Sequence, residues 1–225
     1  MSAPLRVLLV GHGRMGRMVA AVAGDYDVEI TGVVTSGNAS DRSTWPDAQV
    51  AIDFSTADAV AANARHLAAR GASLVIGTTG WQRDEAMLRS DLVGSGVGVI
   101  AAPNFAIGVN IFIALAGRSA ELLAARGFSP WIHESHHAAK KDAPSGTALA
   151  IKQAVEAAGG PVEIASTRAG HIPGTHTLGF DSEAEMITFT HTARDRTAFA
   201  RGALEAARWI NGRQGWFSMR DMLNL

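Results

Sequence analysis

A glycine-rich turn near the N-terminus constrains the fold of this chain more than any other feature. The apolar run Arg6 to Val10 leads directly into Gly-His-Gly-Arg-Met-Gly, which fits the fingerprint G-x-G-x-x-G. Gly11 permits a tight turn, Gly13 lets the backbone approach a pyrophosphate, and Gly16 lets the next helix pack close to the strand. That helix presents free N–H groups and the positive end of its dipole to phosphates. The pattern predicts dinucleotide binding, with a purely structural turn as the alternative.

The first hundred residues alternate short apolar strands with helices. We expect strands over Arg6–Val10, Glu29–Thr35, Val50–Phe54, Leu74–Ile76 and Val97–Ala101, and helices over Arg14–Gly24, Asp58–Arg70 and Arg83–Ser90. Such alternation is typical of a parallel sheet covered on both faces, which indicates an α/β, Rossmann-type nucleotide domain. The polar stretch from Ser36 to Asp47 contains Pro46 and predicts a short, non-helical connection.

The pattern changes after Pro103. We expect helices over Asn110–Ala125, Thr147–Ala158, Ala203–Asn211 and near Met219, and strands over Pro130–Ser135, Glu163–Ser166, His176–Phe180, Glu185–Thr192 and Arg196–Phe199. This order predicts a second, α+β domain built on a mixed sheet with helices on one face.

Composition excludes several classes of function. The formal net charge is −1 and the Lys and Arg residues are scattered, which disfavours a nucleic-acid partner. The chain has no cysteine, so it has no disulfide, thiolate nucleophile or cysteine-bound metal. Its longest apolar stretches are interrupted before membrane length, and the apolar N-terminal run is too short for a secretory signal. We expect a cytoplasmic protein with no membrane partner.

Several small-residue loops follow the expected strands, at the sheet edge where ligands bind in α/β folds. Ordinary turn chemistry is the alternative for each loop taken singly. The candidate cofactor-binding residues are Gly11, His12, Gly13, Arg14, Met15, Gly16, Thr35, Ser36, Phe54, Gly77, Thr78, Thr79, Ala102, Pro103, Asn104 and Phe105.

The end of the second strand bears on cofactor choice. A carboxylate there usually holds the adenosine ribose, but the first one after this strand is Asp41. Thr35 and Ser36 can instead hydrogen-bond a 2′-phosphate, and Arg14 or Arg42 can supply charge. We therefore expect NADPH to be accepted at least as well as NADH.

The segment from Glu134 to Ala148 concentrates two histidines, two lysines and a helix start. Ser145 is a good N-cap residue, and the free N–H groups after it, beside a lysine, suit a carboxylate. Histidine exchanges protons near neutral pH, so the segment predicts a site that holds and protonates a small anion. Structural histidines and a solvated lysine pair are the alternatives. A metal site is disfavoured because neither H-E-x-x-H nor a cysteine ligand is present, so we expect no metal.

This segment resembles the signature of the dihydrodipicolinate reductase family, E-x-H-H-x-x-K-x-D-A-P-S-G-T-A, at every fixed position. The resemblance continues in order along the chain. It includes Gly-Arg-Met-Gly in the first turn, Gly77–Gly80, Asn104–Asn110, Pro173–His176 and Thr190–Leu204.

The resemblance implies a reductase of lysine and diaminopimelate biosynthesis that converts 4-hydroxy-tetrahydrodipicolinate to tetrahydrodipicolinate with hydride from NADH or NADPH. It implies that His136 is the acid–base histidine and Lys140 the proton donor. It also implies that His137, Gly146 and Thr147 bind the two carboxylates of a small dicarboxylate substrate. Lys141 occupies a variable position of the signature.

The resemblance further implies a dinucleotide-binding domain over 1–104 plus about 202–225, a substrate-binding and oligomerisation domain over 105–201, and a homotetramer. The glycine turn is one residue shorter than the common family form, and the two loops Ser36–Asp47 and Thr167–Leu178 are compact. Two alternatives remain. One is a dehydrogenase of another small amino-acid-like substrate, and the other is a non-catalytic nucleotide sensor.

Overall fold

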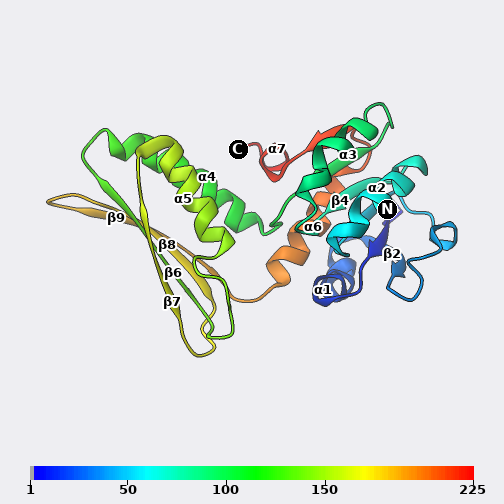
Figure 1. Cartoon of the computed structure of the whole chain (residues 1–225), viewed down its shortest axis with the longest axis horizontal. Helices are drawn as coiled ribbons and strands as arrows, with labels where there is room; N and C mark the ends of the chain where they lie inside the picture. Colours follow the sequence, from blue (N-terminus) through cyan, green and yellow to red (C-terminus); the bar gives the residue numbers. More distant parts are fainter. Residues whose placement is uncertain (1–2) are drawn as a thin grey trace. The chain divides into compact units, whose positions relative to one another are not determined.

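The computed structural model describes residues 3–225, which form two compact units (Figure 1). The first unit runs from the N-terminus to Ile107 and again from Arg196 to Asn224. The second unit comprises Gly108 to Asp195. The chain thus passes between the units after Ile107 and again after Asp195.

The first unit is built on a six-stranded sheet with the strand order β10-β5-β4-β3-β1-β2. Every pairing in this sheet is parallel. The strands are β1 (Leu5–Val10), β2 (Val28–Val34), β3 (Val50–Asp53), β4 (Ser73–Ile76), β5 (Gly98–Ala101) and β10 (Gly215–Phe217). The central strands β3 and β4 are buried along their whole length, as expected for a sheet covered on both faces.

Helices cover both faces of this sheet. Successive side chains of each strand point to opposite faces, and both faces carry apolar side chains that helices bury. Val7 and Leu9 of β1 join a core with α1 and α6, whereas Leu8 and Val10 join a second core with α2 and α3. These helices are α1 (Arg14–Val22), α2 (Ala57–Ala69), α3 (Glu85–Asp91) and α6 (Thr197–Ile210). The prediction of a Rossmann-type α/β domain is confirmed.

The second unit contains a four-stranded mixed sheet in the order β7-β6-β8-β9. Strands β6 and β7 are parallel and the other pairs are antiparallel. The elements are α4 (Ile107–Ala124), β6 (Ser129–His136), α5 (Gly146–Gly159), β7 (Glu163–Arg168), β8 (Gly174–Asp181) and β9 (Met186–Ala193). Helices α4 and α5 lie on one face of the sheet (Figure 1), with Phe112, Ile132 and Ile151 in the shared core. The predicted α+β architecture is confirmed.

Four details differ from or complete the sequence-based expectations. The expected strand Arg196–Phe199 is wrong: α6 begins at Thr197, because Ala200, Ala203 and Leu204 bury one helical face in the first core. Strand β10 was not expected, since three residues are too few to show a period. The connection from Ser36 to Asp47 holds only a short 3₁₀ turn, as expected, and α7 (Met219–Leu223) lies where a last helix was expected.

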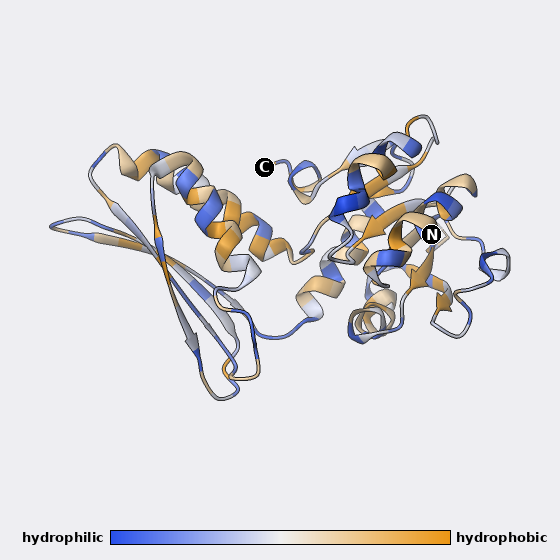
Figure 2. Ribbon diagram, viewed as in Figure 1, coloured by the Kyte–Doolittle hydropathy of each residue, from blue (hydrophilic) through white to orange (hydrophobic). Residues whose placement is uncertain are grey.

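Helix α4 is long and apolar enough to cross a membrane by length and composition, contrary to the expectation that no stretch reaches this length. The core helix of a water-soluble domain meets the same test. Here Phe112, Ala116 and Ala120 pack against the sheet of the second unit, and α4 and α5 both carry mainly hydrophobic residues (Figure 2). The apolar character of α4 is therefore explained in part by its place in this core.

Candidate active site

The glycine turn of the first unit has the geometry that its sequence predicted. Gly11 has a φ of +100°, and a Cβ there would lie 2.4 Å from the carbonyl oxygen of Phe54. A Cβ on Gly16 would lie 2.0 Å from the carbonyl oxygen of Gly11. At Gly13, by contrast, a Cβ would meet nothing within 4 Å, and no side chain caps α1. The first turn of α1 is thus open to an approaching pyrophosphate, and these residues fit a dinucleotide.

The remaining cofactor candidates lie in the loops that follow β2, β3, β4 and β5, at the carboxyl edge of the sheet. Thr35, Ser36 and Thr79 are exposed there, and His12 and Arg14 are exposed in the glycine turn after β1 and in the first turn of α1. Other candidates turn inward: Phe105 is buried in the first core, and Thr78 is buried as well. The ring of Phe54 covers Gly77, where a Cβ would lie 2.1 Å from a ring carbon.

The two arginines expected near a 2′-phosphate differ in their surroundings. Both Nε and Nη2 of Arg42 donate to Oδ1 of Asn63, at 3.2 and 3.1 Å, and the guanidinium lies over the ring of Trp45. Arg14 is exposed in the first turn of α1. A 2′-phosphate would therefore meet an Arg42 that is already held by an amide oxygen and an aromatic ring.

Sequence analysis missed a buried carboxylate that organises these loops. Oδ1 of Asp53 accepts hydrogen bonds from the backbone N–H of Ser55 at 2.8 Å and the hydroxyls of Ser55 and Thr78 at 2.6 and 2.9 Å. Oδ2 accepts from the side-chain amide of Asn63 at 3.1 Å. The available signal was a single charged residue at the end of the apolar strand Val50–Asp53.

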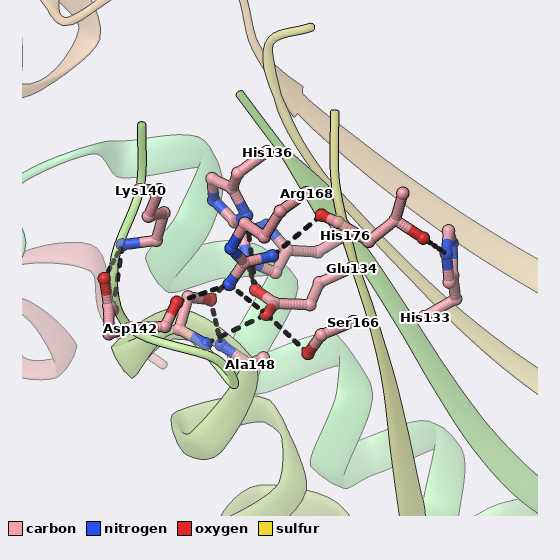
Figure 3. Close-up of polar contacts among 11 residues, drawn as sticks. His133, Glu134, His136, Lys140, Asp142, Ala148, Ser166, Arg168 and His176 are labelled. Carbon is pink, nitrogen blue, oxygen red and sulfur yellow. Dashed lines mark hydrogen bonds and ion pairs between the residues drawn. The ribbon is translucent and has the colours of Figure 1, made fainter. Parts of the chain in front are cut away.

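The second unit brings the histidine and lysine segment together around another buried carboxylate (Figure 3). Ile132, Glu134 and His136 alternate along β6 and face the helices, so Glu134 lies fully buried. Its Oε1 accepts three hydrogen bonds, from the backbone N–H of Ser145 at 3.0 Å, the hydroxyl of Ser166 at 2.7 Å and Nη2 of Arg168 at 2.7 Å.

The two expected catalytic residues lie at the end of β6, for His136, and in the loop between β6 and α5, for Lys140. Nδ1 of His136 is 3.3 Å from Oε2 of Glu134. Nζ of Lys140 donates to both carboxylate oxygens of Asp142, at 2.7 and 2.8 Å. Arg168 also donates to the backbone carbonyl of Asp142, so one guanidinium links the loop to the buried carboxylate.

The expected substrate-binding residues lie at the start of α5 and the end of β6. Ser145 caps α5 as predicted, with its hydroxyl accepting from the backbone N–H of Ala148 at 3.2 Å. Gly146 is exposed and a Cβ there would meet nothing within 4 Å, while Thr147 is half-buried in the first turn. His137 is half-buried in the turn after β6, and its carbonyl accepts from the backbone N–H of Lys140. A carboxylate can reach the open N-terminus of α5.

Burial and hydrogen bonding shift the pKa values of this cluster. Burial acts to raise the pKa of Glu134, but the hydrogen bonds from Ser145, Arg168 and Ser166 outweigh it and lower that pKa to about 2. Burial lowers the pKa of His136, and Lys140 and Arg168 lower it further, while Glu134 acts in the opposite direction. Burial and the neighbouring His136 lower the pKa of His176 to about 4. The site thus holds a carboxylate that stays ionised at neutral pH, beside histidines that favour the neutral form.

His176 and Arg168 were given no role in the sequence analysis. Nε2 of His176 lies 3.0 Å from the hydroxyl of Ser145, and the two histidine rings of His136 and His176 meet edge to face at 5.2 Å. The sequence did contain a signal for His176, because this residue belongs to the Pro173–His176 motif of the family. It contained no signal for Arg168, because only the pairing of β6 with β7 brings this residue beside His136.

Glu134, His136 and His176 could also hold a metal ion, since their ligand atoms lie within 4.8 Å of one another. Local residue spacing, on which the expectation of no metal depended, does not detect ligands that come from different strands. The guanidinium of Arg168, 2.7 Å from the same carboxylate, opposes a second cation. This arrangement favours proton chemistry over metal binding.

Comparison with known proteins identifies the family. Residues 5–105 match the model for the N-terminal part of dihydrodipicolinate reductase, and residues 108–223 match the model for its C-terminal part. The chain belongs to the dihydrodipicolinate reductase family. Its resemblance to that family, expected from the segment Glu134 to Ala148, is confirmed.

Individual relatives cover almost the whole chain. A 4-hydroxy-tetrahydrodipicolinate reductase from Acidiphilium cryptum is 38% identical and matches over 99% of both chains. One from Caulobacter vibrioides is 34% identical over 99% of this chain and 98% of its own. These relatives are named reductases, and this chain is an oxidoreductase of the same family.

Solved structures agree on the fold. A dipicolinate-bound dihydrodipicolinate reductase from Paenisporosarcina sp. TG-14 superimposes with a TM-score of 0.82 at 21% identity, covering 96% of this chain and 97% of that one. An amine dehydrogenase from Mycobacterium smegmatis reaches 0.63 at 11% identity, with 95% and 94% covered. At these identities the likeness concerns the fold alone.

We predict that Asp53→Ala destabilises the first unit by about 2 to 4 kcal/mol, because buried donors of Ser55, Thr78 and Asn63 lose their acceptor. Denaturant unfolding followed by tryptophan fluorescence measures the loss. Asp58→Ala is the control, since Asp58 is exposed and its ion pair is with exposed Arg83, and it should change stability by less than about 0.5 kcal/mol. Equal effects of the two variants would contradict the role given to Asp53.

We predict that stability falls as the pH is lowered from about 6.5 to about 4. His176 has a pKa of about 4 when folded, against 6.5 in the unfolded chain, so the unfolded state binds more protons in this window. The loss from this group is about 2 to 3 kcal/mol at pH 4. Glu134, with a folded pKa of about 2 against 4.5, adds a further loss from about pH 4.5 downward.

Denaturant unfolding at several pH values tests this with two variants. His176→Gln should flatten the dependence between pH 6.5 and 4, whereas His171→Gln, which changes an exposed histidine, should keep the parental slope. A parental slope in His176→Gln would show that another group carries the acid sensitivity.

Proposed function

We propose that this chain is a 4-hydroxy-tetrahydrodipicolinate reductase of lysine and diaminopimelate biosynthesis, producing tetrahydrodipicolinate with hydride from NADPH or NADH. The observation that carries the proposal is the cluster at the start of α5, where His136, Lys140 and an open helix N-terminus come together. It stands in a chain whose glycine turn fits a dinucleotide. The names of the relatives support the same activity.

The second unit is proposed to bind the dicarboxylate. The backbone N–H groups and hydroxyl at Gly146 and Thr147 suit one carboxylate, since α5 offers the positive end of its dipole there. His137, in the turn after β6, is proposed to contact the other. The dipicolinate bound in the Paenisporosarcina reductase is a small ring dicarboxylate of this kind.

The first unit is proposed to hold the cofactor through its glycine turn and the exposed residues of the neighbouring loops. The nicotinamide supplies the hydride when it is bound. The chain's own residues supply the proton and the charge: Lys140 and His136 stabilise the negative charge that develops on the reduced substrate, and one of them protonates it. NADPH is proposed to serve at least as well as NADH, because no carboxylate stands directly at the end of β2 to repel a 2′-phosphate, the first being Asp41.

The family resemblance supports a cytoplasmic homotetramer assembled through the second unit. The face of the mixed sheet away from α4 and α5 offers a surface for this assembly. It carries hydrogen-bonded threonine pairs, Thr175 with Thr192 and Thr177 with Thr190, next to His133 on β6. Threonine suits a flat strand surface, and cross-strand pairs of this kind make it regular.

The activity is tested by the decay of nicotinamide absorbance when substrate is generated in place from pyruvate and aspartate semialdehyde by the preceding synthase. NADPH and NADH are run side by side. We expect synthase-dependent oxidation with both cofactors, and at least as fast with NADPH. If nucleotide binds and a control reductase is active, yet no oxidation occurs, the activity is not the one proposed.

The roles of the two catalytic candidates are tested in the same assay. Lys140→Ala and His136→Ala should each lower turnover by roughly 10²-fold or more, because general acid catalysis contributes about that much. Nucleotide affinity, measured by fluorescence titration, should stay at the parental value, since both residues lie in the second unit. Near-parental turnover of either variant would remove that residue from the mechanism.

A further inference from the structure

The carboxylate of Glu134 uses its two oxygens very differently. Oε1 accepts three hydrogen bonds, whereas Oε2 is buried and has no hydrogen-bond partner among the residues that the structure describes. Two imidazoles face Oε2: Nδ1 of His136 at 3.3 Å and Nε2 of His176 at 3.6 Å. Nδ1 of His136 is itself a buried atom that lacks a well-directed hydrogen bond within residues 3–225. An unused acceptor and an unused ring nitrogen therefore lie opposite each other.

We propose that Glu134 is the positioning residue of the reaction: Oε2 accepts a hydrogen bond from the protonated Nδ1 of His136, which leaves Nε2 as the atom that exchanges a proton with the substrate. This inference rests on the proposed function, in which His136 is the acid–base histidine. The 3.3 Å separation needs only a small turn of the ring to become a directed hydrogen bond.

The other contacts of Glu134 explain why it can serve only as an acceptor. Ser145, Ser166 and Arg168 all donate to Oε1, and they hold the pKa of the carboxyl far below neutrality. An ionised carboxylate has no proton to give, so the ring nitrogen that faces it must carry one. A neutral His136 is then fixed in a single tautomer, with Nδ1 protonated and Nε2 basic.

The opposite edge of the imidazole is kept clear by a glycine. A Cβ on Gly174 would lie 2.9 Å from both Nε2 and Cδ2 of His136. Gly174 pairs with Ala193 at the first position of β8 and has no left-handed φ, so the backbone there does not itself demand glycine. The lack of a side chain instead leaves room beside the nitrogen that the proposal makes reactive.

The charged groups around His136 agree with this role. Arg168 on the neighbouring strand and Lys140 and Asp142 in the following loop all act on its pKa, and Glu134 is the group that most favours its protonated form. His176 on β8 also faces the ring. Removing the negative charge of Glu134 should therefore lower the pKa of His136. That shift separates a positioning role from a merely structural one.

The first test needs no substrate and no variant of Glu134. Nitrogen-15 NMR of the parental protein reports which ring nitrogen carries the proton, and the resonance missing from His136→Gln assigns His136 among the eight histidines. Above its pKa, His136 should show a protonated Nδ1 and an unprotonated Nε2. A protonated Nε2 overturns the proposal, whatever the activity of the protein.

The second test replaces Glu134 by its isostere. In Glu134→Gln, Oε1 can still accept from Ser145, Ser166 and Arg168, but the amide presents N–H to Nδ1 and favours the opposite tautomer. Turnover should fall by roughly 10²-fold or more with little change in KM, and the alkaline limb of the kcat profile, where His136 loses its proton, should move to lower pH. Glu163→Gln, which changes an exposed carboxylate at the start of β7, should match the parental protein. Unchanged turnover and an unchanged limb in folded Glu134→Gln overturn the proposal.

A third variant covers the case in which Glu134→Gln fails to fold, since it leaves half-buried Arg168 without its carboxylate partner. Gly174→Ala alters no charge and adds a methyl group against the end of a side chain that can move. Its thermal stability should stay near the parental value, while turnover falls and the His136 tautomer becomes mixed. Parental turnover together with the parental NMR pattern would count against the importance of this edge of the ring.

Zinc provides the remaining control, because the same three side chains are candidate metal ligands. We expect stoichiometric Zn²⁺ to leave the NMR signals of His136 and His176 in place and not to raise turnover. Shifted signals with raised turnover would identify a metal centre and overturn the proposal. Absence of reductase activity in the parental protein would refute the proposed function alone, since the tautomer is measured independently.

Discussion

The ion pair between Glu134 and Arg168 is the interaction on which the geometry of the second unit depends. A fully buried carboxylate is costly unless it is paired and hydrogen-bonded. Here one oxygen joins the side chains of β6 and β7 to the backbone at the start of α5, and the same guanidinium reaches the carbonyl of Asp142. One charged pair thus fixes a strand, a helix N-terminus and the lysine-bearing loop relative to one another. Removing either partner would leave a buried charge without compensation.

The first unit uses the same device at a different place. Asp53 ends β3, is buried, and accepts hydrogen bonds from the loops that follow β3 and β4 as well as from α2. In both units a carboxylate at or near the end of a buried strand organises loops that are rich in small residues. Such loops have little apolar surface of their own, so backbone and hydroxyl donors directed at one anion supply the order that packing cannot.

The charge balance of the second unit also suits its proposed chemistry. Lys140 and Arg168 bring two cations near His136, and both lower the pKa of the imidazole, while Glu134 and Asp142 oppose them. A dianionic substrate entering this surrounding would add negative charge and favour the protonated histidine. His136 would then be protonated, and able to act as an acid, when the substrate is present. Because Oε2 of Glu134 faces Nδ1, the proton that His136 gives to the substrate would come from Nε2.

The sequence by itself determined much of this protein. The strand and glycine turn predicted the nucleotide-binding fold, because period-2 apolar runs and glycines at fixed spacing have local causes. The segment Glu134 to Ala148 predicted the helix start at Ser145 and the family.

The sequence failed where the cause was not local. Arg196–Phe199 was expected to be a strand, but α6 begins at Thr197 because it buries Ala200 and Ala203 in the first core. The three-residue strand β10 is defined by its pairing with β5. Tertiary structure alone decided that Arg168 and His176 meet Glu134, since strand pairing brings together residues more than thirty positions apart. Asp53 shows the same limit, because a buried carboxylate is recognised only when its donors are in place.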